Sequence, residues 1–365
     1  MKNILVVEPW IDKSELDQLK RVIDSTYVTE AQLTKEFEEI TSKYINNKYS
    51  VSISNGTMGL FCCLKQLNLS EDDEVIVPNI TFISTATAAL LAGAKIRLVD
   101  VDPITACIDI KSLEMAINHN TKVIMPVHLY GRSCEMDEVI SIAQRNNLQI
   151  IEDAAQGIGV FYKNRHVGTL GNFGVLSYYG NKTITTGEGG IVICPDSESL
   201  EDIYRLKNHG RSKKGTFIHE TIGWNFAFTE MQAAIGISQM GKLNKIVDRK
   251  LKIYNTYLNK LDNKLLSMNS VPKSTTRVVH WLSNINCDDS SKLQDYLKAN
   301  EIPSRKIFFP LNRQPCFRNE SRIINSNDRF DNSELALKKI LSLPSSILMD
   351  DEQQNYVINV LNNYQ

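Results

Sequence analysis

The feature that most constrains the fold of this chain is an alternation of short β-like and α-like segments that begins near residue 49. Strands that alternate with helices favour an α/β fold, with a mostly parallel sheet and helices on both faces. The predicted strands are Ser50–Ser54, Glu74–Val77, Ile96–Asp100, Val123–Leu129, Gln149–Glu152, Gly174–Tyr178 and Ile191–Cys194. The predicted helices are Met58–Leu67, Ile83–Ala92, Lys111–Ile117 and Glu135–Asn146.

Segments on either side of this alternation have a different pattern. Before it, two amphipathic helices are predicted over Asp12–Asp24 and Gln32–Tyr44, the first with Leu16, Leu19 and Ile23 on one apolar face. After Met240 the pattern predicts a smaller α+β domain, so that the chain divides into residues 1–245 and 246–365. This part contains a Lys-rich helical stretch (Gly241–Leu265), a strand (Val278–Ile285), a helix (Ser290–Asn300), a helical stretch (Asn332–Ser342) and a polar tail.

Composition excludes several classes of protein. The chain is 42% hydrophobic with a formal net charge of −1, so it can bury a large core and has no overall field that would attract nucleic acid or an anionic membrane. No apolar stretch is long enough to span a membrane, and the first residues lack a secretory signal. The seven cysteines are scattered without a CxxC motif, which predicts a reduced cytoplasmic protein without a metal site.

The stretch FGVLSYYGNKTITTGEGGIV, residues 173–192, places one lysine directly after a β-like run. Lys182 is followed by hydroxyl residues and glycines, which permit tight turns around Glu188. A lysine at the end of a strand is well placed to form a Schiff base with a carbonyl cofactor. The pattern alone leaves open a turn lysine between two hairpin strands.

Two segments predict a phosphate site. Ser54-Asn55-Gly56-Thr57 closes the first strand and opens a helix, where free amides and the helix dipole favour an anion, and Gly56 allows close approach. Ser177, at the end of the strand before Lys182, carries a hydroxyl that could donate to the same phosphate. A plain helix N-cap is the alternative for the first segment.

Two further residues suit a flat, charged heteroaromatic ring, and a third, Asn225, is notable for its neighbours. Phe82 follows a strand end and could stack on such a ring, although it could equally belong to the core. Asp153 closes an apolar strand, where a carboxylate needs a cation or a donor; a protonated pyridine nitrogen or the next turn would satisfy it. Asn225 is the single amide between aromatics in a loop before a capping box, unless that loop is simply a packed turn.

Together these segments resemble the DegT/DnrJ/StrS family of sugar aminotransferases, which depend on pyridoxal phosphate (PLP). The resemblance is carried by SNGT (54–57), VPNITF (77–82), PVHLYG (126–131), IEDAAQ (151–156), SYYGNKTITTGEGG (177–190), LKNHGR (206–211) and GWNFAFTEMQAAIG (223–236). It implies the aspartate-aminotransferase fold (fold type I): a large domain with a mainly parallel seven-stranded sheet, a small C-terminal domain, and a homodimer. YGNKTITTGEGG and SRKIFFP (304–310) are most similar to the perosamine synthase branch.

The resemblance also implies roles for individual residues. Lys182 would bind PLP covalently and move protons, Asp153 would pair with the pyridine nitrogen, and Gln156 would lie near the ring hydroxyl. Phe82 would cover the ring. The phosphate would be held by Gly56, Thr57 and Ser177, and by Asn225 of the other subunit.

The implied reaction takes an amino group from glutamate to C4 of a nucleotide-linked 4-keto-6-deoxyhexose. Arg305 and Lys306 are the candidates for contact with the substrate diphosphate, with a solvated basic turn as the alternative. Departures occur at Ala227 and Phe228, after Asn225, and at His280 in the segment Val278–Trp281. The alternatives are a 3-keto-sugar or inosose aminotransferase, the dehydratase branch, against which Lys182 argues, and a non-catalytic scaffold.

Overall fold

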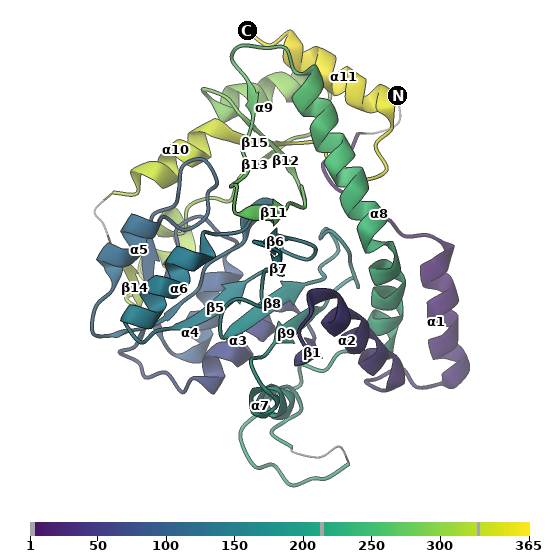
Figure 1. Ribbon diagram of the computed structural model, residues 1–365, viewed down its shortest axis with the longest axis vertical. Helices are drawn as coiled ribbons and strands as arrows, with labels where there is room; N and C mark the ends of the chain where they lie inside the picture. Colours follow the sequence, from purple (N-terminus) through teal and green to yellow (C-terminus); the bar gives the residue numbers. More distant parts are fainter. Residues whose placement is uncertain (1–3, 212–214, 327–328) are drawn as a thin grey trace.

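The computed structural model describes residues 4–211, 215–326 and 329–365. An eight-stranded sheet lies at its centre in the order β1-β9-β8-β5-β4-β2-β3-β14 (Figure 1). Its pairs are parallel except those of β9, which runs antiparallel to β1 and β8. The bounds are β1 (Ser50–Ile53), β2 (Glu74–Pro78), β3 (Lys95–Val99), β4 (Thr121–Ile124), β5 (Gln149–Asp153), β8 (Phe173–Ser177), β9 (Gly190–Ile193) and β14 (Ile323–Asn325). The predicted α/β fold is confirmed, with all seven predicted strands present.

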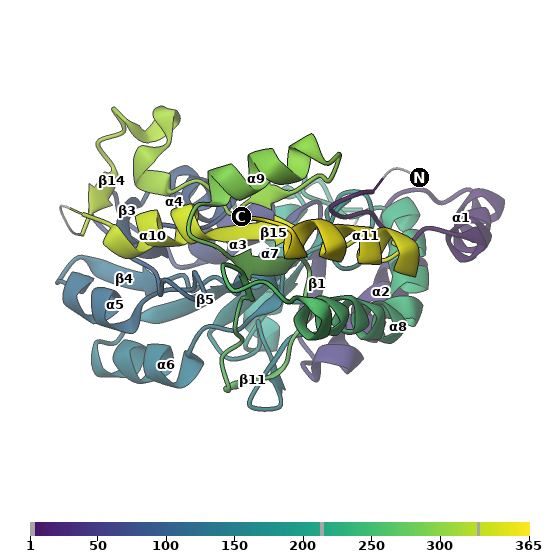
Figure 2. The same ribbon diagram turned by 90° about the horizontal axis from the view of Figure 1, so that it is seen from above.

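Helices cover both faces of this sheet, which explains why β2 and β8 are buried along their whole length (Figure 2). One apolar core contains residues of α2, α5, α6 and α8, and the other contains residues of α3, α4 and α7. The bounds are α2 (Gln32–Ile45), α3 (Gly56–Gln66), α4 (Ser84–Ala92), α5 (Ile110–Ala116), α6 (Met136–Arg145), α7 (Ser197–Lys207) and α8 (Glu230–Lys260).

The first helix, α1 (Lys13–Ser25), forms as predicted but turns a different face to the protein. Leu16 and Ile23, expected on the buried face, are 63% and 60% exposed. The buried residues of the helix are Glu15 and Val22. Glu15 accepts hydrogen bonds from Ser238 and Gln239 and forms an ion pair with Lys242, all on α8. These polar contacts join residues more than 220 positions apart in the sequence. They fix the rotation of α1 about its axis, so that Glu15 faces the protein and Leu16 and Ile23 face solvent.

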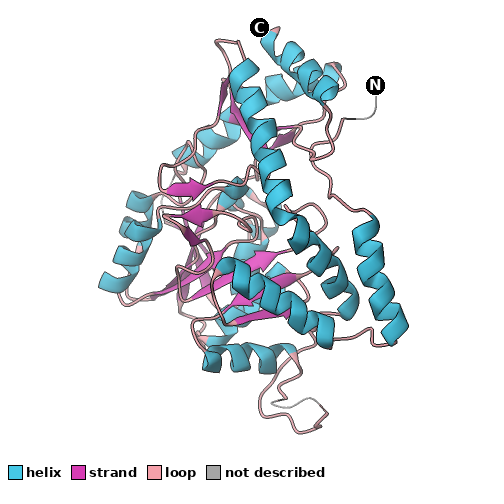
Figure 3. Ribbon diagram, turned by 45° about the vertical axis from the view of Figure 1, so that its right-hand side comes forward, coloured by secondary structure: helices cyan, strands magenta, loops and turns pink. Residues whose placement is uncertain are grey.

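The 31-residue helix α8 runs from the central sheet to the C-terminal part of the molecule (Figure 3). It begins at the predicted capping box, in which Thr229 and Gln232 bond to each other's backbone amides. The predicted boundary between residues 245 and 246 falls inside this helix. The division into two domains therefore stays a prediction.

The C-terminal part contains a second sheet in the order β10-β12-β15-β13, which shares an apolar core with α8, α9 and α11, whereas α10 contributes Ala336 to the core of the large sheet. Its elements are β10 (Ser267–Met268), β12 (Ser283–Asn286), β13 (Arg305–Lys306), β15 (Ile340–Leu343), α9 (Ser290–Ala299), α10 (Asp331–Lys339) and α11 (Asp351–Asn362). The predicted polar tail is thus largely the helix α11, which a capping box at Asp350 starts. The stretch expected to be helical to Ser342 leaves the helix at Lys339, because Ile340–Leu343 pairs with β12 and β13.

Two segments that follow α8 pair with strands of the N-terminal part, one in the large sheet and one in a separate three-stranded sheet in the order β11-β6-β7. β14 pairs in parallel with β3 and adds an edge strand that was not predicted. β11 (Thr275–Arg277) pairs with β6 (Phe161–Tyr162), which forms a hairpin with β7 (Arg165–His166). The strand predicted over Val278–Ile285 is therefore wrong in its first part: after β11 the chain crosses the PVHLYG loop, where the Val279 amide donates to Gly131 O.

No helix within the described residues is both long enough and apolar enough to cross a membrane.

Candidate active site

The carboxyl ends of β5 and β8 place Asp153 and Ser177 at one edge of the sheet, beside the first turn of α3. Lys182 lies in the turn that follows β8, where its amide donates to Tyr179 O at 2.9 Å. In a parallel sheet this edge is where ligands bind. The structure therefore gathers residues that lie more than 120 positions apart in the sequence.

Lys182 is partly buried, and its Nζ atom lies 4.9 Å from the centre of the Trp281 ring. The surrounding protein excludes water from the ammonium group and lowers the pKa of Lys182 to about 8, although the negative charge of Asp153 acts in the opposite direction. A lysine that gives up its proton near pH 8 becomes a nucleophilic amine more readily than a solvated one. Lys182 does lie in the connection between the antiparallel strands β8 and β9, as the alternative of a turn lysine expects, but its partial burial distinguishes it from a solvated surface lysine.

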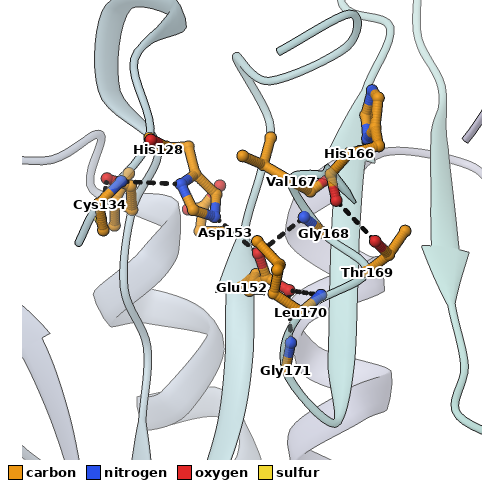
Figure 4. A network of polar contacts seen from close by, with 12 residues as sticks. His128, Cys134, Glu152, Asp153, His166, Val167, Gly168, Thr169, Leu170 and Gly171 are labelled. Atoms are coloured by element: carbon orange, nitrogen blue, oxygen red, sulfur yellow. Dashed lines mark hydrogen bonds and ion pairs between the residues drawn. The ribbon is translucent and has the colours of Figure 1, made fainter. Parts of the chain in front are cut away.

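Glu152 and Asp153 are adjacent but have different surroundings (Figure 4). The fully buried Glu152 carboxylate accepts hydrogen bonds from the amides of Gly168, Leu170 and Gly171 and bonds to Nε2 of His128 at 2.8 Å. Burial alone would raise the pKa of Glu152, but His128 and these amides hold it below its usual value. Every acceptor site is occupied within the protein, so we assign Glu152 to the scaffold of the loop after β7.

Asp153 is buried and faces the other side of β5. Its Oδ2 accepts from the Thr85 hydroxyl at 2.6 Å, and its Oδ1 accepts from the Ala155 amide at 3.1 Å. The bond to the Ala155 amide is the contact with the next turn that the sequence analysis gave as one alternative. Each carboxylate oxygen of Asp153 keeps a further lone pair that can accept from a cation. Thr85, which the sequence analysis missed, lies in the first turn of α4, three residues after Phe82. The only signal for it in the sequence is a hydroxyl residue near a strand end.

An anion cradle forms where α3 begins. Asn55 caps the helix by accepting from the Met58 amide at 3.0 Å. A Cβ atom on Gly56 would come within 3.2 Å of Ser177 Cβ, and one on Gly190 would come within 3.0 Å of Gly56 N, so glycine keeps both approaches open. The Thr57 hydroxyl lies close by and donates to Ser84 at 2.7 Å. Helix amides, a dipole and hydroxyls suit a phosphate group.

Four aromatic rings, which we call the aromatic wall, extend from Phe82 to Trp281. Phe82 is 55% exposed and lies 5.8 Å from Phe308, which stacks on Tyr130 at 5.7 Å; Tyr130 stacks on Trp281 at 6.1 Å. Lys182 lies over the far end of this wall. Only Phe82 was predicted from the sequence, because the other rings come from loops that meet through the fold.

Tyr130 connects the wall to the remaining predicted residues. It adopts a left-handed backbone conformation (φ 54°), and its amide donates to Oε1 of Gln156 at 2.6 Å. Its hydroxyl accepts from the Phe308 amide at 3.0 Å. The Trp281 indole donates to the carbonyl of Asn181, the residue before Lys182, at 2.6 Å. Gln156 thus lies in the site, held by a residue that the prediction did not include.

The loop that carries Asn225 lies beside the cradle, because Phe226 O accepts from the Ser54 amide at 3.0 Å. Asn225 itself is exposed. Its aromatic neighbours are covered by their own chain: Trp224 and Phe226 pack on Phe61, and Phe228 is fully buried. The cost of exposing these aromatics therefore does not argue for a partner subunit.

Arg305 and Lys306 project differently from β13. Lys306 Nζ donates to the hydroxyl of Ser291, at the start of α9. Arg305 is exposed, and its charge acts on the Tyr130 hydroxyl, whose pKa is nevertheless raised by burial. Arg305 and Lys306 are neighbours on a strand, so their side chains leave opposite faces of β13.

This set of residues fits PLP. The cradle suits its phosphate, Asp153 its pyridine nitrogen, Lys182 its aldehyde and Phe82 its ring. A metal centre is not indicated: within the described ranges, no three His, Cys, Asp or Glu side chains are grouped to hold a metal ion.

Comparison with known proteins gives the same reading. A model of the DegT/DnrJ/EryC1/StrS aminotransferase family matches residues 9–362. GDP-perosamine synthase from Escherichia coli O157:H7 is 31% identical over 100% of this chain and 99% of that protein, and GDP-perosamine synthase from Caulobacter vibrioides is 33% identical over 87% of each. A crystal structure of a DegT DnrJ EryC1 StrS aminotransferase from Brucella abortus superposes with a TM-score of 0.90 at 26% identity, covering 96% of this chain and 94% of that one. The chain therefore belongs to the DegT/DnrJ/EryC1/StrS aminotransferase family.

Proposed function

We propose that this aminotransferase moves an amino group from glutamate to C4 of a nucleotide-linked 4-keto-6-deoxyhexose and yields a 4-amino-4,6-dideoxy sugar nucleotide. The observation that carries the proposal is the Lys182 amine, with its lowered pKa, beside a buried Asp153 and a helix-start phosphate cradle. Similarity to two proteins named GDP-perosamine synthase, over 100% and 87% of this chain, supports the sugar 4-amino product. The enzyme would act in the cytoplasm.

Bound PLP supplies an electron sink for the carbon that loses or gains the amino group. The protein contributes the rest. Asp153 would hold a positive charge on the pyridine nitrogen, with its carboxylate kept in place by Thr85. Lys182 would move protons at the reacting carbon, for which a pKa of about 8 is well matched to neutral solution. The aromatic wall excludes water on the side of the incoming sugar.

A direct assay tests the proposal. The purified enzyme is incubated with glutamate and one candidate acceptor at a time, and the masses of the products are measured by mass spectrometry. The acceptors are GDP-, UDP- and dTDP-linked 4-keto-6-deoxyhexoses, a 3-keto-sugar nucleotide and an inosose. We expect the mass change of keto to amino, with 2-oxoglutarate formed, only for a 4-keto nucleotide sugar. Amination of the 3-keto sugar or the inosose alone would contradict the assignment. A colourless protein that aminates none of them would support a non-catalytic scaffold.

Arg305→Ala should raise the KM for the nucleotide sugar by about 10-fold, since hydrogen bonds to charged groups contribute about 1.5–3 kcal/mol. The glutamate half-reaction should keep its rate, because Arg305 lies on β13 of the C-terminal part, outside the cradle formed by Gly56, Thr57 and Ser177. Lys306→Ala is the matched control, since Lys306 bonds to Ser291. Rapid-mixing measurement of each half-reaction separates the two effects, and an equal loss in both would argue against substrate contact.

We further propose a homodimer in which Asn225 reaches the phosphate cradle of the other subunit. Its exposure and the position of its loop beside Ser54 are consistent with this role. Lys182→Ala and Asn225→Asp should each be inactive. Refolding the two together should restore up to one working site per mixed dimer, because one site then carries both lesions and the other neither.

The control for this mixing experiment is the double variant refolded with itself, which should stay inactive. Exchange of subunits is verified with two affinity tags. If mixed dimers form and no activity returns, or if an active monomer is found by sedimentation, Asn225 does not act across an interface.

A further inference from the structure

The side chain of Arg132 is buried without a partner. It follows the short helix η1 (Leu129–Gly131) and is 1% exposed. Its Nε and Nη1 atoms lie out of contact with solvent and have no hydrogen-bond partner among the described residues. No ion pair is formed by Arg132 within the described part of the chain. An arginine in a protein cannot lose its proton, so this is a permanent positive charge in the interior.

Two positive charges, those of Arg132 and Lys250, act on the ring of His280. Lys250, on α8, is buried, and among the described residues its Nζ donates to the carbonyls of Trp281 and Ser345. His280 is buried and stacks on Tyr254 with ring centres 3.6 Å apart. Burial, together with the charges of Arg132 and Lys250, lowers the pKa of His280 to about 3, so this ring is neutral. We call Arg132, Lys250 and His280 the cationic seam.

A carboxylate is missing from the groups that act on Arg132 within the described residues. Burial lowers its pKa, and the groups that oppose this are the Cys107 thiol and the phenols of Tyr254 and Tyr130. A buried charge without a counter-charge is strongly destabilising, whereas a paired and hydrogen-bonded one is tolerated. Arg132 thus presents a positive charge and unused N–H donors to an anion that can reach it.

We propose that the cationic seam binds one small anion at Arg132, either an inorganic ion such as chloride or a compact carboxylate. The burial of Arg132 and the packed rings around it limit the size, which excludes a nucleotide or a sugar phosphate. The site is separate from the phosphate cradle of α3. It lies behind the aromatic wall, because Arg132 comes two residues after Tyr130 and His280 precedes Trp281.

Such an anion would hold together three segments that meet at the seam: the PVHLYG loop, α8 and the crossing after β11. Two of them supply the stacked rings of Tyr130 and Trp281 next to Lys182. The inference does not depend on the identity of the sugar substrate, and its test below does not use turnover.

The test is thermal unfolding of the full-length holoenzyme at pH 6. Sodium chloride or sodium formate is titrated against the sodium salt of a bulky sulfonate buffer at constant ionic strength. We expect a saturable rise in Tm of roughly 2–5 °C. Arg132→Met should remove this rise, while the exposed control Arg318→Met should respond like the wild type. Response to chloride alone identifies an inorganic site, and response to formate alone identifies a carboxylate site.

Two further measurements keep the proposal open to refutation. Lys250→Met should shift the titration midpoint to higher anion concentration, and chloride NMR linewidths report binding directly if Arg132→Met does not fold. Cys107 is the internal competitor, because its thiol also acts on Arg132. It lies within 3.9 Å of the Ser133 carbonyl, to which a protonated and therefore uncharged thiol donates. Identical salt responses of the wild type and Arg132→Met, or no chloride line broadening together with no rise in Tm, would overturn the proposal.

Discussion

Lys182→Ala should abolish transamination, with a loss of more than about 10⁴-fold, because the same side chain serves as covalent anchor and as proton carrier. The visible absorbance of lysine-bound cofactor should disappear with it. Binding of PLP need not be lost, since the cradle at Gly56, Thr57 and Ser177 is untouched. Absorbance spectra and single-turnover assays of the purified variant measure both effects.

Borohydride reduction of the wild type, followed by peptide mapping, is the decisive control for this prediction. Lys250 is the competing candidate for the lysine that binds the cofactor, since burial lowers its pKa to about 8 as well. It lies in the cationic seam, on the other side of Trp281 from the cradle. A pyridoxyl label on Lys250 or any other lysine, with Lys182 free, would refute the assignment.

Asp153→Ala should lower turnover on the order of 10²-fold or more, because a preorganised charge aimed at the cofactor is lost. The fold should change little, since the variant removes only the bonds to Thr85 and Ala155. Asp153→Asn keeps the shape and loses the charge, so it should be nearly as slow. Turnover of this variant near the wild-type rate would show that the negative charge is not used.

Glu152 is the matched control on the same strand. Glu152→Gln leaves the neighbouring carboxylate in place but disturbs four bonds to a buried acceptor, so it should cost about 3 kcal/mol of folding free energy. Its turnover per folded molecule should stay close to that of the wild type. Urea unfolding and active-site titration together distinguish the loss of fold expected here from the loss of chemistry expected at Asp153.

The residues that could be predicted from sequence are those whose position follows from local pattern. Lys182, Asp153, Ser177 and Gly56 each stand at the end of a strand or the start of a helix, and parallel pairing brings those ends to one edge. The alternation of strands and helices was enough to predict that arrangement. The roles of Arg305 and Asn225 are not settled by local pattern and stay predictions.

The residues that could not be predicted depend on contacts between distant segments. Tyr130, Trp281 and Phe308 meet only because the chain crosses from β11 over the PVHLYG loop. The buried face of α1 was predicted wrongly for the same reason, since its Glu15 finds partners on α8. The short β14 carries no long apolar run, and only the exposed edge of β3 explains why it forms a strand.

The pairing of β14 with the large sheet and of β11 with β6 has a consequence for engineering new specificities within this family. An obvious experiment is a chimera in which residues 246–365 are replaced by the corresponding segment of a relative that makes another amino sugar. Here that exchange would also replace the strand that covers β3, the partner of β6 and the indole that bonds beside Lys182. The exchanged protein would therefore stay active only if the donor's segments make these three contacts. The residues that determine substrate choice are thus distributed along the chain and do not form a separate module.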